Sequence, residues 1–178
     1  PNKPFRDLAW GLASRGIAVL RYEKRTRVYG TKLAADASLT VREEVIDDAV
    51  EAVRLLQKTD GLDPRRIFVL GHRLGGMLMP RLALALKPLG AAGFISLAGL
   101  TYPLEDTILV QTAYILSLDG GLSEEDRKKL EEVETDVAKI KALTEADRGS
   151  TEKPLNAAPA YWLVLRGYDP LETVVRVD

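Results

Sequence analysis

One continuous stretch, residues 67–86 (IFVLGHRLGGMLMPRLALAL), constrains the fold more than any other part of the sequence. Its first four residues, Ile67–Leu70, are all apolar, which is typical of a strand buried on both faces of a parallel sheet. The helix expected from about Leu74 to Leu86 is apolar almost all round and needs cover on every side. A tight Gly-x-x-x-Gly turn joins the two elements. The stretch therefore predicts an α/β fold in which helices flank a parallel sheet.

The rest of the first hundred residues repeats this alternation. Apolar side chains at helical spacing predict a helix over residues 5–12, and the apolar run 17–22 (IAVLRY) predicts a strand. Thr40-x-x-Glu43 is a capping box, which predicts the start of a second helix. Residues 92–97 (AGFISL) supply another candidate strand. Strands that alternate with helices imply right-handed crossovers and a parallel sheet.

The sequence then becomes mainly helical. Residues 104–118 predict a helix, and Ser123, with Asp126 three residues later, is expected to cap a long charged one. Within the charged helix, apolar positions between Leu130 and Thr144 recur at alternating spacings of three and four. We interpret them as one narrow face packed on the domain. A coiled-coil partner helix is the alternative, for which two heptads are a weak basis.

These patterns divide the chain into three regions. Residues 1–100 are expected to form the α/β core, residues 101–168 a helical region, and residues 169–178 the start of a return to the core. The polar segment 23–39 is expected to be a surface loop. Residues 157–166 fit either a short helix or a strand.

Charge and composition exclude several classes of function. Lys and Arg total 25 and Asp and Glu 26, so a net charge of −1 indicates neither nucleic acid nor an anionic membrane as partner. No apolar run approaches the roughly 20 residues that a membrane span needs, and no signal peptide is visible. With 178 residues, 46% of them hydrophobic, the chain can form one domain with a sizeable core.

Cysteine and histidine usage limits the chemistry further. Without cysteine the chain has no disulfide, no thiolate metal site and no cysteine nucleophile, and it is compatible with a cytoplasmic location. A single histidine cannot supply a histidine-rich metal site. We therefore expect no metal and no cofactor.

The strand–turn–helix stretch resembles the nucleophile elbow of α/β-hydrolases. Gly71-His72-x-Leu74-Gly75-Gly76 is similar to the Gly-His-Ser-Leu-Gly-Gly elbow of bacterial esterases and of acyl-peptidase-like and dienelactone-hydrolase-like members. The upstream stretches PFRDLAWGLASRGIAVLRYEKR and LTVREEVIDDAVEAVRLLQ resemble the segments that lead to the elbow in those proteins. The resemblance covers most of the chain. It implies a partial α/β-hydrolase fold, the central portion, with a helical cap inserted after the sixth strand.

The resemblance also implies roles for two elbow residues. Arg73 occupies the position of the nucleophilic serine, but its guanidinium stays protonated, with a pKa above about 12, and cannot act as a nucleophile. The backbone N–H of Leu74 fits the role of an oxyanion donor. The location of a second donor stays open.

No catalytic triad can be assembled from the sequence. The acid and histidine of the family's triad follow the serine in chain order, whereas His72, the one histidine, lies on the elbow itself. We interpret His72 as a packing or hydrogen-bonding residue of the turn. Asp169 and Asp178 are conceivable acids but are interpreted as turn residues. No serine stands in a Gly-x-Ser-x-Gly turn, including Ser14, Ser38, Ser96, Ser117, Ser123 and Ser150.

A gap in the sheet is a further implication of the resemblance. In the family, a strand not found in this chain lies between the strands predicted at 17–22 and 67–70. Unpaired backbone groups at such a gap are costly when they are buried. Either another chain supplies the strand, or the sheet closes up in a new order, or the chain is part of a larger molecule.

Two functional hypotheses follow. The first is a serine esterase by ancestry that is inactive in this form, because Arg73 replaces the nucleophile and the triad acid and histidine are absent. The second is a non-catalytic binding or self-assembly module. As a binding module, it would use Arg73 to hold a carboxylate-type ligand, a small ester or a phosphate. As an assembly module, it would form a homo-oligomer through exposed sheet edges. A simpler alternative is that the Arg73 guanidinium is only solvated or paired with an acid. Another is that the arginine at this position was introduced by design or by accident.

Overall fold

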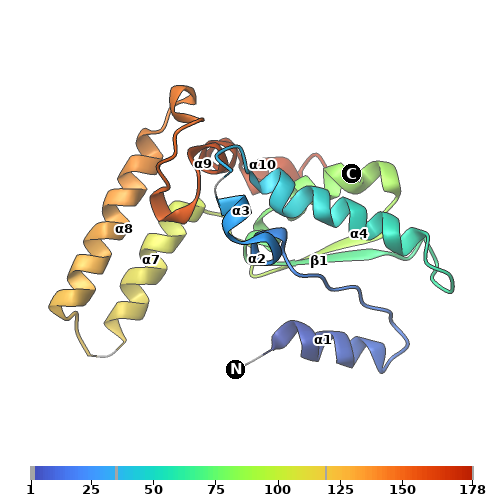
Figure 1. Cartoon of the computed structure of the whole chain (residues 1–178). Helices are drawn as coiled ribbons and strands as arrows, with labels where there is room; N and C mark the ends of the chain where they lie inside the picture. The colour runs from blue at the N-terminus through green and yellow to red at the C-terminus, as the bar shows by residue number, and fades with distance from the viewer. Residues whose placement is uncertain (1–2, 35, 119, 178) are drawn as a thin grey trace.

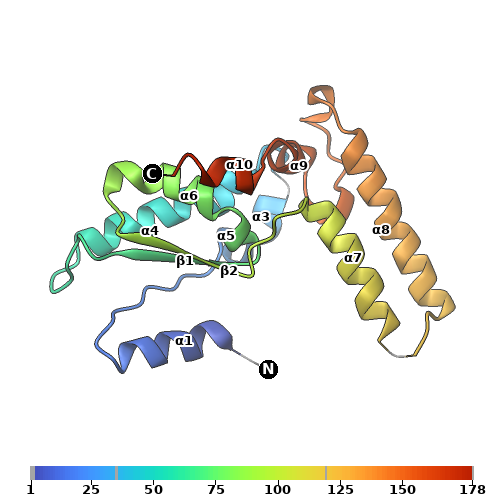
Figure 2. The same ribbon diagram turned by 180° about the vertical axis from the view of Figure 1, so that it is seen from behind.

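The computed structural model describes residues 3–34, 36–118 and 120–177 (Figure 1). A two-stranded parallel sheet lies in its α/β body. Strand β1 (Phe68–His72) pairs with β2 (Gly93–Leu97), from Phe68 opposite Gly93 to His72 opposite Leu97. A hairpin of two long helices projects from one end of this body (Figures 1 and 2). The α/β class and the parallel sheet predicted from the sequence are confirmed.

One face of the sheet is well covered. Helices α4 (Asp47–Gln57) and α6 (Met79–Leu86) both lie on it (Figure 2). Their apolar sides form one cluster with the side chains of this sheet face, in which Ala49, Val53, Ile67, Met79, Leu82 and Leu86 are buried and Val69 and Phe94 are partly buried. Each large side chain buried in this way contributes about 1.5–3 kcal/mol to the stability of the fold.

The opposite face of the sheet is thinly covered. Helix α1 (Pro4–Ala13) lies below it and apart from the rest of the body (Figure 1). The ring of Phe5 meets the ring of His72 edge-on, with 5.5 Å between the centroids. Phe68, Ile95 and Leu97 remain exposed on this side.

The strand predicted at residues 17–22 does not form. The segment has no regular secondary structure and pairs with no strand of the described chain, and its side chains Ile17, Val19, Leu20 and Tyr22 are exposed. A strand needs backbone partners as well as an apolar pattern, and here no neighbouring strand supplies them. The sheet therefore does not close up in a new strand order that includes residues 17–22, which was one of the three ways to resolve the gap.

The predicted Thr40–Glu43 box is only partly formed at the start of the second helical region, because the bond from the N–H of Glu43 to the Thr40 hydroxyl is replaced by one from Arg42. Glu43 Oε2 accepts hydrogen bonds from the backbone N–H of Thr40 at 2.9 Å and from its hydroxyl at 2.6 Å. Thr40 Oγ1 in turn accepts from the N–H of Arg42 at 3.1 Å. The region opens with a short π-helix, η1 (Arg42–Ile46), before α4 begins.

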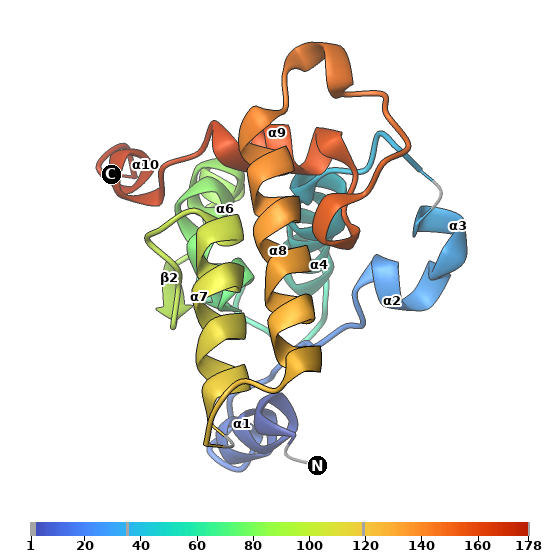
Figure 3. The same cartoon turned by 90° about the vertical axis from the view of Figure 1, so that its left-hand side faces the viewer.

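The two hairpin helices are α7 (Leu104–Ser117) and α8 (Glu124–Ala142), which lie side by side (Figure 3). Ser123 and Asp126 form the predicted capping box at the start of α8. Val137 and Ile140 of the predicted apolar face are buried, which confirms that this face packs on the protein. Thr144 lies beyond the end of α8 and is exposed.

A second buried cluster joins the base of the hairpin to the body. It consists of Val41, Met77, Leu78, Ile140, Tyr161, Trp162, Leu165 and Tyr168. Several of these belong to α9 (Pro159–Arg166), so the helical alternative for residues 157–166 is correct. A last helix, α10 (Pro170–Val174), lies beside α6 (Figure 2).

The remaining elements are short. The segment expected as a loop contains α2 (Arg25–Tyr29) and α3 (Thr31–Ala34). Helix α5 (Leu74–Met77) is separated from α6 by Leu78, and the 3-10 turns are η2 (Lys87–Leu89), η3 (Glu145–Asp147) and η4 (Pro154–Asn156). Across the described ranges, no helix is both long and apolar enough to cross a membrane.

Candidate functional site

The turn between β1 and α5 holds Arg73 in a strained backbone conformation. Its φ is 53° and its ψ −113°, in a region that favours glycine. Two backbone hydrogen bonds hold it there. The N–H of Arg73 donates to the carbonyl oxygen of Leu97 at 3.0 Å, and the carbonyl oxygen of Arg73 accepts from the N–H of Met77 at 2.8 Å. The strain is therefore imposed by the ends of both strands and by the first turn of the helix.

Two of the three turn glycines are required by close packing. A Cβ on Gly71 would clash with the carbonyl group of Gly75, and a Cβ on Gly76 would lie 2.8 Å from the Cα of Gly99. A Cβ on Gly75 would meet nothing within 4 Å. The predicted need for glycine thus applies to Gly71 and Gly76, whereas Gly75 could accept a side chain.

The side chain of Arg73 is exposed and reaches the helical hairpin. Its Nη2 donates a hydrogen bond of 2.6 Å to Oε1 of Gln111 on α7. Within the part of the chain that the structure describes, no carboxylate forms an ion pair with this guanidinium. The alternative in which Arg73 is paired with an acid therefore does not apply to the described residues.

The residues on either side of Arg73 differ in their surroundings. His72 is exposed and contacts Phe5 on the thinly covered face of the sheet. Leu74 is half-buried and packs against the second cluster. Its N–H is the first of α5, and no acceptor for it is found among residues 3–34, 36–118 and 120–177. A donor thus lies next to Arg73 with its hydrogen-bonding capacity unused.

A cavity of about 380 Å³ lies between the hairpin and the segment around α2 and α3. Its walls are mainly apolar and aromatic, with a few polar groups, as in many ligand pockets. Leu104 and Ile108 of α7 line it, as do Tyr161 and Trp162 of α9. Ile108 lies one helical turn from Gln111, so the cavity and the Arg73 contact share one side of α7.

Glu44 is the best-connected polar residue of this cavity. Its carboxylate accepts from the Tyr161 hydroxyl at 2.7 Å and from the Thr26 hydroxyl at 2.9 Å. Burial and the charge of Glu44 raise the pKa of Tyr161, so this phenol stays protonated and keeps donating. These bonds connect η1, α2 and α9 around the cavity.

Backbone strain is also found in the cavity wall. Leu155 and Asn156 are consecutive non-glycine residues with positive φ, 49° and 63°. The carboxylate of Asp136 on α8 accepts a hydrogen bond of 2.8 Å from the N–H of Leu155. The hairpin thereby holds the cavity wall in shape.

The other candidate groups have structural roles. Asp169 caps α10, because its carboxylate accepts from the N–H groups of Leu171 at 2.7 Å and Glu172 at 3.0 Å. Ser96 donates to the carbonyl oxygen of Gly76 at 3.1 Å. Asp178 lies outside the described residues. Among the residues that are described, no group of three or more His, Cys, Asp or Glu side chains could hold a metal ion.

Neither Gln111 nor Glu44 could be recognised as a site residue from local sequence patterns. Gln111 is one of several polar residues of α7, and Glu44 follows the capping glutamate directly. Their partners lie 38 and 117 positions away. No local pattern indicates such contacts, and only the folded chain shows them.

Comparison with known proteins agrees with this architecture. A profile of the alpha/beta hydrolase fold matches residues 42–174, which is most of the chain. Esterase EstD of Thermotoga maritima is 38% identical over 177 residues, covering 99% of this chain and 39% of the esterase. The chain thus spans well under half the length of that relative, and no solved structure matches it. With a parallel sheet, helices on its face and most of its length matched by this profile, the chain belongs to the α/β-hydrolase fold family.

Proposed function

We propose that the chain carries an esterase-type hydrolase scaffold with Arg73 at the nucleophile position, and that it does not hydrolyse esters in this form. The observation that carries the proposal is the backbone of Arg73, with φ 53° and ψ −113° between a parallel strand and a helix. A nucleophile elbow needs a strained strand-to-helix turn of this kind, which exposes the central side chain. The similarity to Esterase EstD supports the choice of ester chemistry.

The proposed lack of activity follows from the chemistry of acyl transfer. In a serine esterase, the hydroxyl attacks the ester carbonyl while a histidine takes its proton. A protonated guanidinium has no free electron pair for this attack. His72 is directed to Phe5 on the sheet face and is the one histidine of the chain. Nucleophile and base are therefore both lacking in this sequence.

Part of the catalytic environment is nevertheless retained in this proposal. The free N–H of Leu74, at the start of α5, is suited to stabilise an oxyanion. Residues 101–168 act as the cap, and the cavity of about 380 Å³ takes the apolar acyl or alcohol group of an ester. The contact between Arg73 and Gln111 connects this cap to the elbow.

Hydrolysis of p-nitrophenyl acetate and butyrate tests the proposal. We expect the native chain, Arg73→Ala and Arg73→Ser all to release nitrophenolate at the rate of the blank, with Arg54→Ala as a control at another exposed arginine. Turnover by the native chain that Arg73→Ala abolishes would sink the inactive assignment. Turnover gained by Arg73→Ser would show that an unrecognised base serves this position.

A second candidate function is the binding of small carboxylates or phosphate by Arg73. The exposed guanidinium donates to the neutral Gln111 and to no carboxylate of the described chain, so charge and further N–H groups are free for an anion. Calorimetric titration with acetate and phosphate tests it. We expect heat with the native chain and none with Arg73→Ala, while Arg54→Ala binds normally. Absence of heat and of a thermal shift in the native chain counts against this function.

A further inference from the structure

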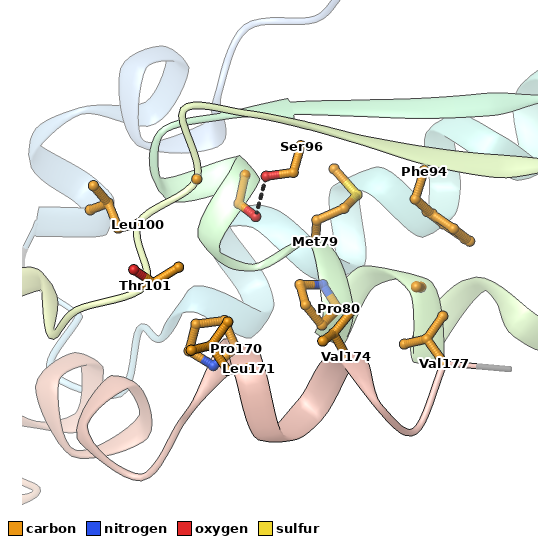
Figure 4. Close-up of a pocket in the computed structure, with 13 residues that line it drawn as sticks. Met79, Pro80, Phe94, Ser96, Leu100, Thr101, Pro170, Leu171, Val174 and Val177 are labelled. Carbon is orange, nitrogen blue, oxygen red and sulfur yellow. Dashed lines mark hydrogen bonds between the residues drawn. The ribbon is translucent and has the colours of Figure 1, made fainter.

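Two cavities of the molecule differ in the charge of their walls. A cavity of about 280 Å³ lies beside α10 and is lined by side chains such as Phe94 and Leu171 (Figure 4). None of the described residues that line it is charged. The cavity of about 380 Å³ between the hairpin and the segment around α2 and α3 also has mainly apolar walls, but Asp36, Glu44 and Lys153 add charge to them. A ligand of this second cavity is therefore expected to combine a charged group with an apolar one.

The charge of Glu44 sets the sign of the field inside this cavity. Its side chain is 11% exposed, and the hydroxyls of Tyr161 and Thr26 fix the position of its carboxylate. Asp36 and Lys153 carry opposite charges, which offset each other in the cavity wall. The remaining charge of the lining residues is the negative charge of Glu44, which favours a cationic group on the ligand.

Within the described chain, the charge of Glu44 is only weakly compensated. The ammonium group of Lys24 lies 3.5 Å from Glu44 Oε1, and the Lys24 side chain is 50% exposed. Hydrogen bonds between an ammonium group and a carboxylate are about 2.7–2.9 Å long when they are strong. The hydroxyls of Thr26 and Tyr161 are neutral donors. A carboxylate has about four lone-pair sites, so these three donors leave one of them for a ligand.

The aromatic side chains of the cavity also suit a cation. Tyr161 and Trp162 line it together, with their rings edge-on and 6.1 Å between the centroids. The indole N–H of Trp162 donates to the carbonyl oxygen of Pro154 at 2.9 Å, and the Tyr161 hydroxyl donates to Glu44. The polar hydrogens of both rings are thus engaged, so the rings offer mainly π surface to a ligand. An ammonium group over the face of such a ring is attracted to it.

We propose that this cavity binds a ligand in which a primary ammonium group is joined to an apolar or aromatic body. The ammonium group donates a hydrogen bond to Glu44, and the body packs against Leu104 and Ile108. The inference rests on the proposed function, which assigns this cavity to the acyl or alcohol group of an ester, and it narrows that group to one that carries an amine. It requires no hydrolysis at Arg73.

Phenethylamine and phenethyl alcohol test the inference, because they differ mainly in the charged group. An alkyl amine is protonated at pH 7, whereas the alcohol is neutral. The chain has two tryptophans, so Trp10→Phe serves as the reference chain in which the fluorescence of Trp162 reports binding. We expect the reference chain to bind the amine roughly tenfold more tightly than the alcohol, because hydrogen bonds between charged groups are stronger than neutral ones.

Two substitutions in the reference chain test the role of Glu44. Glu44→Gln keeps the shape of the side chain and removes its charge. It should weaken binding of the amine by roughly tenfold and leave binding of the alcohol unchanged. Glu131→Gln, at an exposed carboxylate on α8, is the matched control and should alter neither affinity. Thermal unfolding of each variant shows whether it is folded.

The possible failures of this inference can be told apart. Equal affinity of the reference chain for the two ligands would overturn the preference for an ammonium group but leave the cavity as an apolar pocket. Binding of neither ligand would overturn the assignment of the cavity itself. A folded Glu44→Gln chain that still prefers the amine would contradict the role of Glu44. The comparison of the two ligands in the reference chain decides the matter even if Glu44→Gln does not fold.

Discussion

Gly76 and Gly99 meet backbone to backbone, so closely that a methyl group on Gly76 would lie 2.8 Å from the Cα of Gly99. This contact joins the first turn after β1 to the loop after β2. The hydrogen bond of 3.1 Å from Ser96 to the carbonyl oxygen of Gly76 lies at the same place. The position of the Arg73 turn relative to β2 thus depends on the absence of a side chain at these glycines.

We expect Gly76→Ala to lower the free energy of unfolding by about 1–3 kcal/mol, because the added methyl group must displace backbone atoms. Gly75→Ala is the matched control. It has open space around its Cβ position and should be neutral or stabilise α5 by up to about 1 kcal/mol. Urea unfolding followed by tryptophan fluorescence measures both. Equal losses for the two variants would show that the contact with Gly99 is not the cause.

The bond between Tyr161 and Glu44 gives a second prediction. Tyr161→Phe removes a 2.7 Å hydrogen bond to a carboxylate in a largely buried site. We expect a loss of about 1.5–3 kcal/mol, because the bond has a charged acceptor. Tyr114→Phe, at a tyrosine that is 65% exposed, should stay within about 0.5 kcal/mol of the native chain. A Tyr161→Phe chain as stable as the Tyr114→Phe chain would contradict a structural role for this bond.

Stability at high pH should depend on Tyr168. Burial raises the pKa of Tyr168 to about 12, while its hydroxyl donates to the carbonyl oxygen of Met77 at 2.7 Å. An unfolded chain releases this proton near pH 10. The folded state therefore binds the proton more tightly. The stability it gains from this is full below about pH 10 and is lost as the pH rises through about 12.

The measurement is the urea midpoint of the native chain and of Tyr168→Phe between pH 8 and pH 11.5. We expect the native midpoint to fall more steeply above pH 10 than that of the variant. Tyr102→Phe, at an exposed tyrosine, should fall as the native chain does. Parallel curves for all three chains would mean that Tyr168 does not cause the loss of stability at high pH.

Local patterns predicted those parts of the fold that depend on neighbouring residues. The capping box at Ser123–Asp126 and the bond from the N–H of Thr40 to Glu43 are examples, because donor and acceptor lie three positions apart. The apolar runs of β1 and β2 were also sufficient, since each strand is paired. The same kind of run at 17–22 failed, because pairing depends on a strand that the described chain does not place beside it.

The candidate site also has one part that the sequence predicted and one part that it did not. The turn around Arg73 was visible in the spacing of its glycines, and its positive φ agrees with a tight turn. The cavity near it was not visible, because its walls come from α2, η1, α7 and α9, which are distant in sequence. The bond between Arg73 and Gln111 depends on how the hairpin packs on the body.

The strain at Arg73 can be measured by comparing two substitutions. Both Arg73→Ala and Arg73→Gly remove the bond to Gln111, so the difference between them reports the backbone alone. A non-glycine residue at φ 53° costs about 1–3 kcal/mol, and glycine costs about 0.5–1 kcal/mol more entropy on folding. We expect the Gly variant to be more stable than the Ala variant by about 1 kcal/mol.

The same pair at Arg54, within α4, should show the opposite order, because glycine in a helix is about 1 kcal/mol less stable than alanine. Thermal or urea unfolding of the four variants is sufficient to establish both orders. If Ala is favoured over Gly at position 73 as it is at position 54, the turn is not strained. The elbow assignment of Arg73 then loses its main support, because the exposed side chain of a nucleophile elbow depends on that strain.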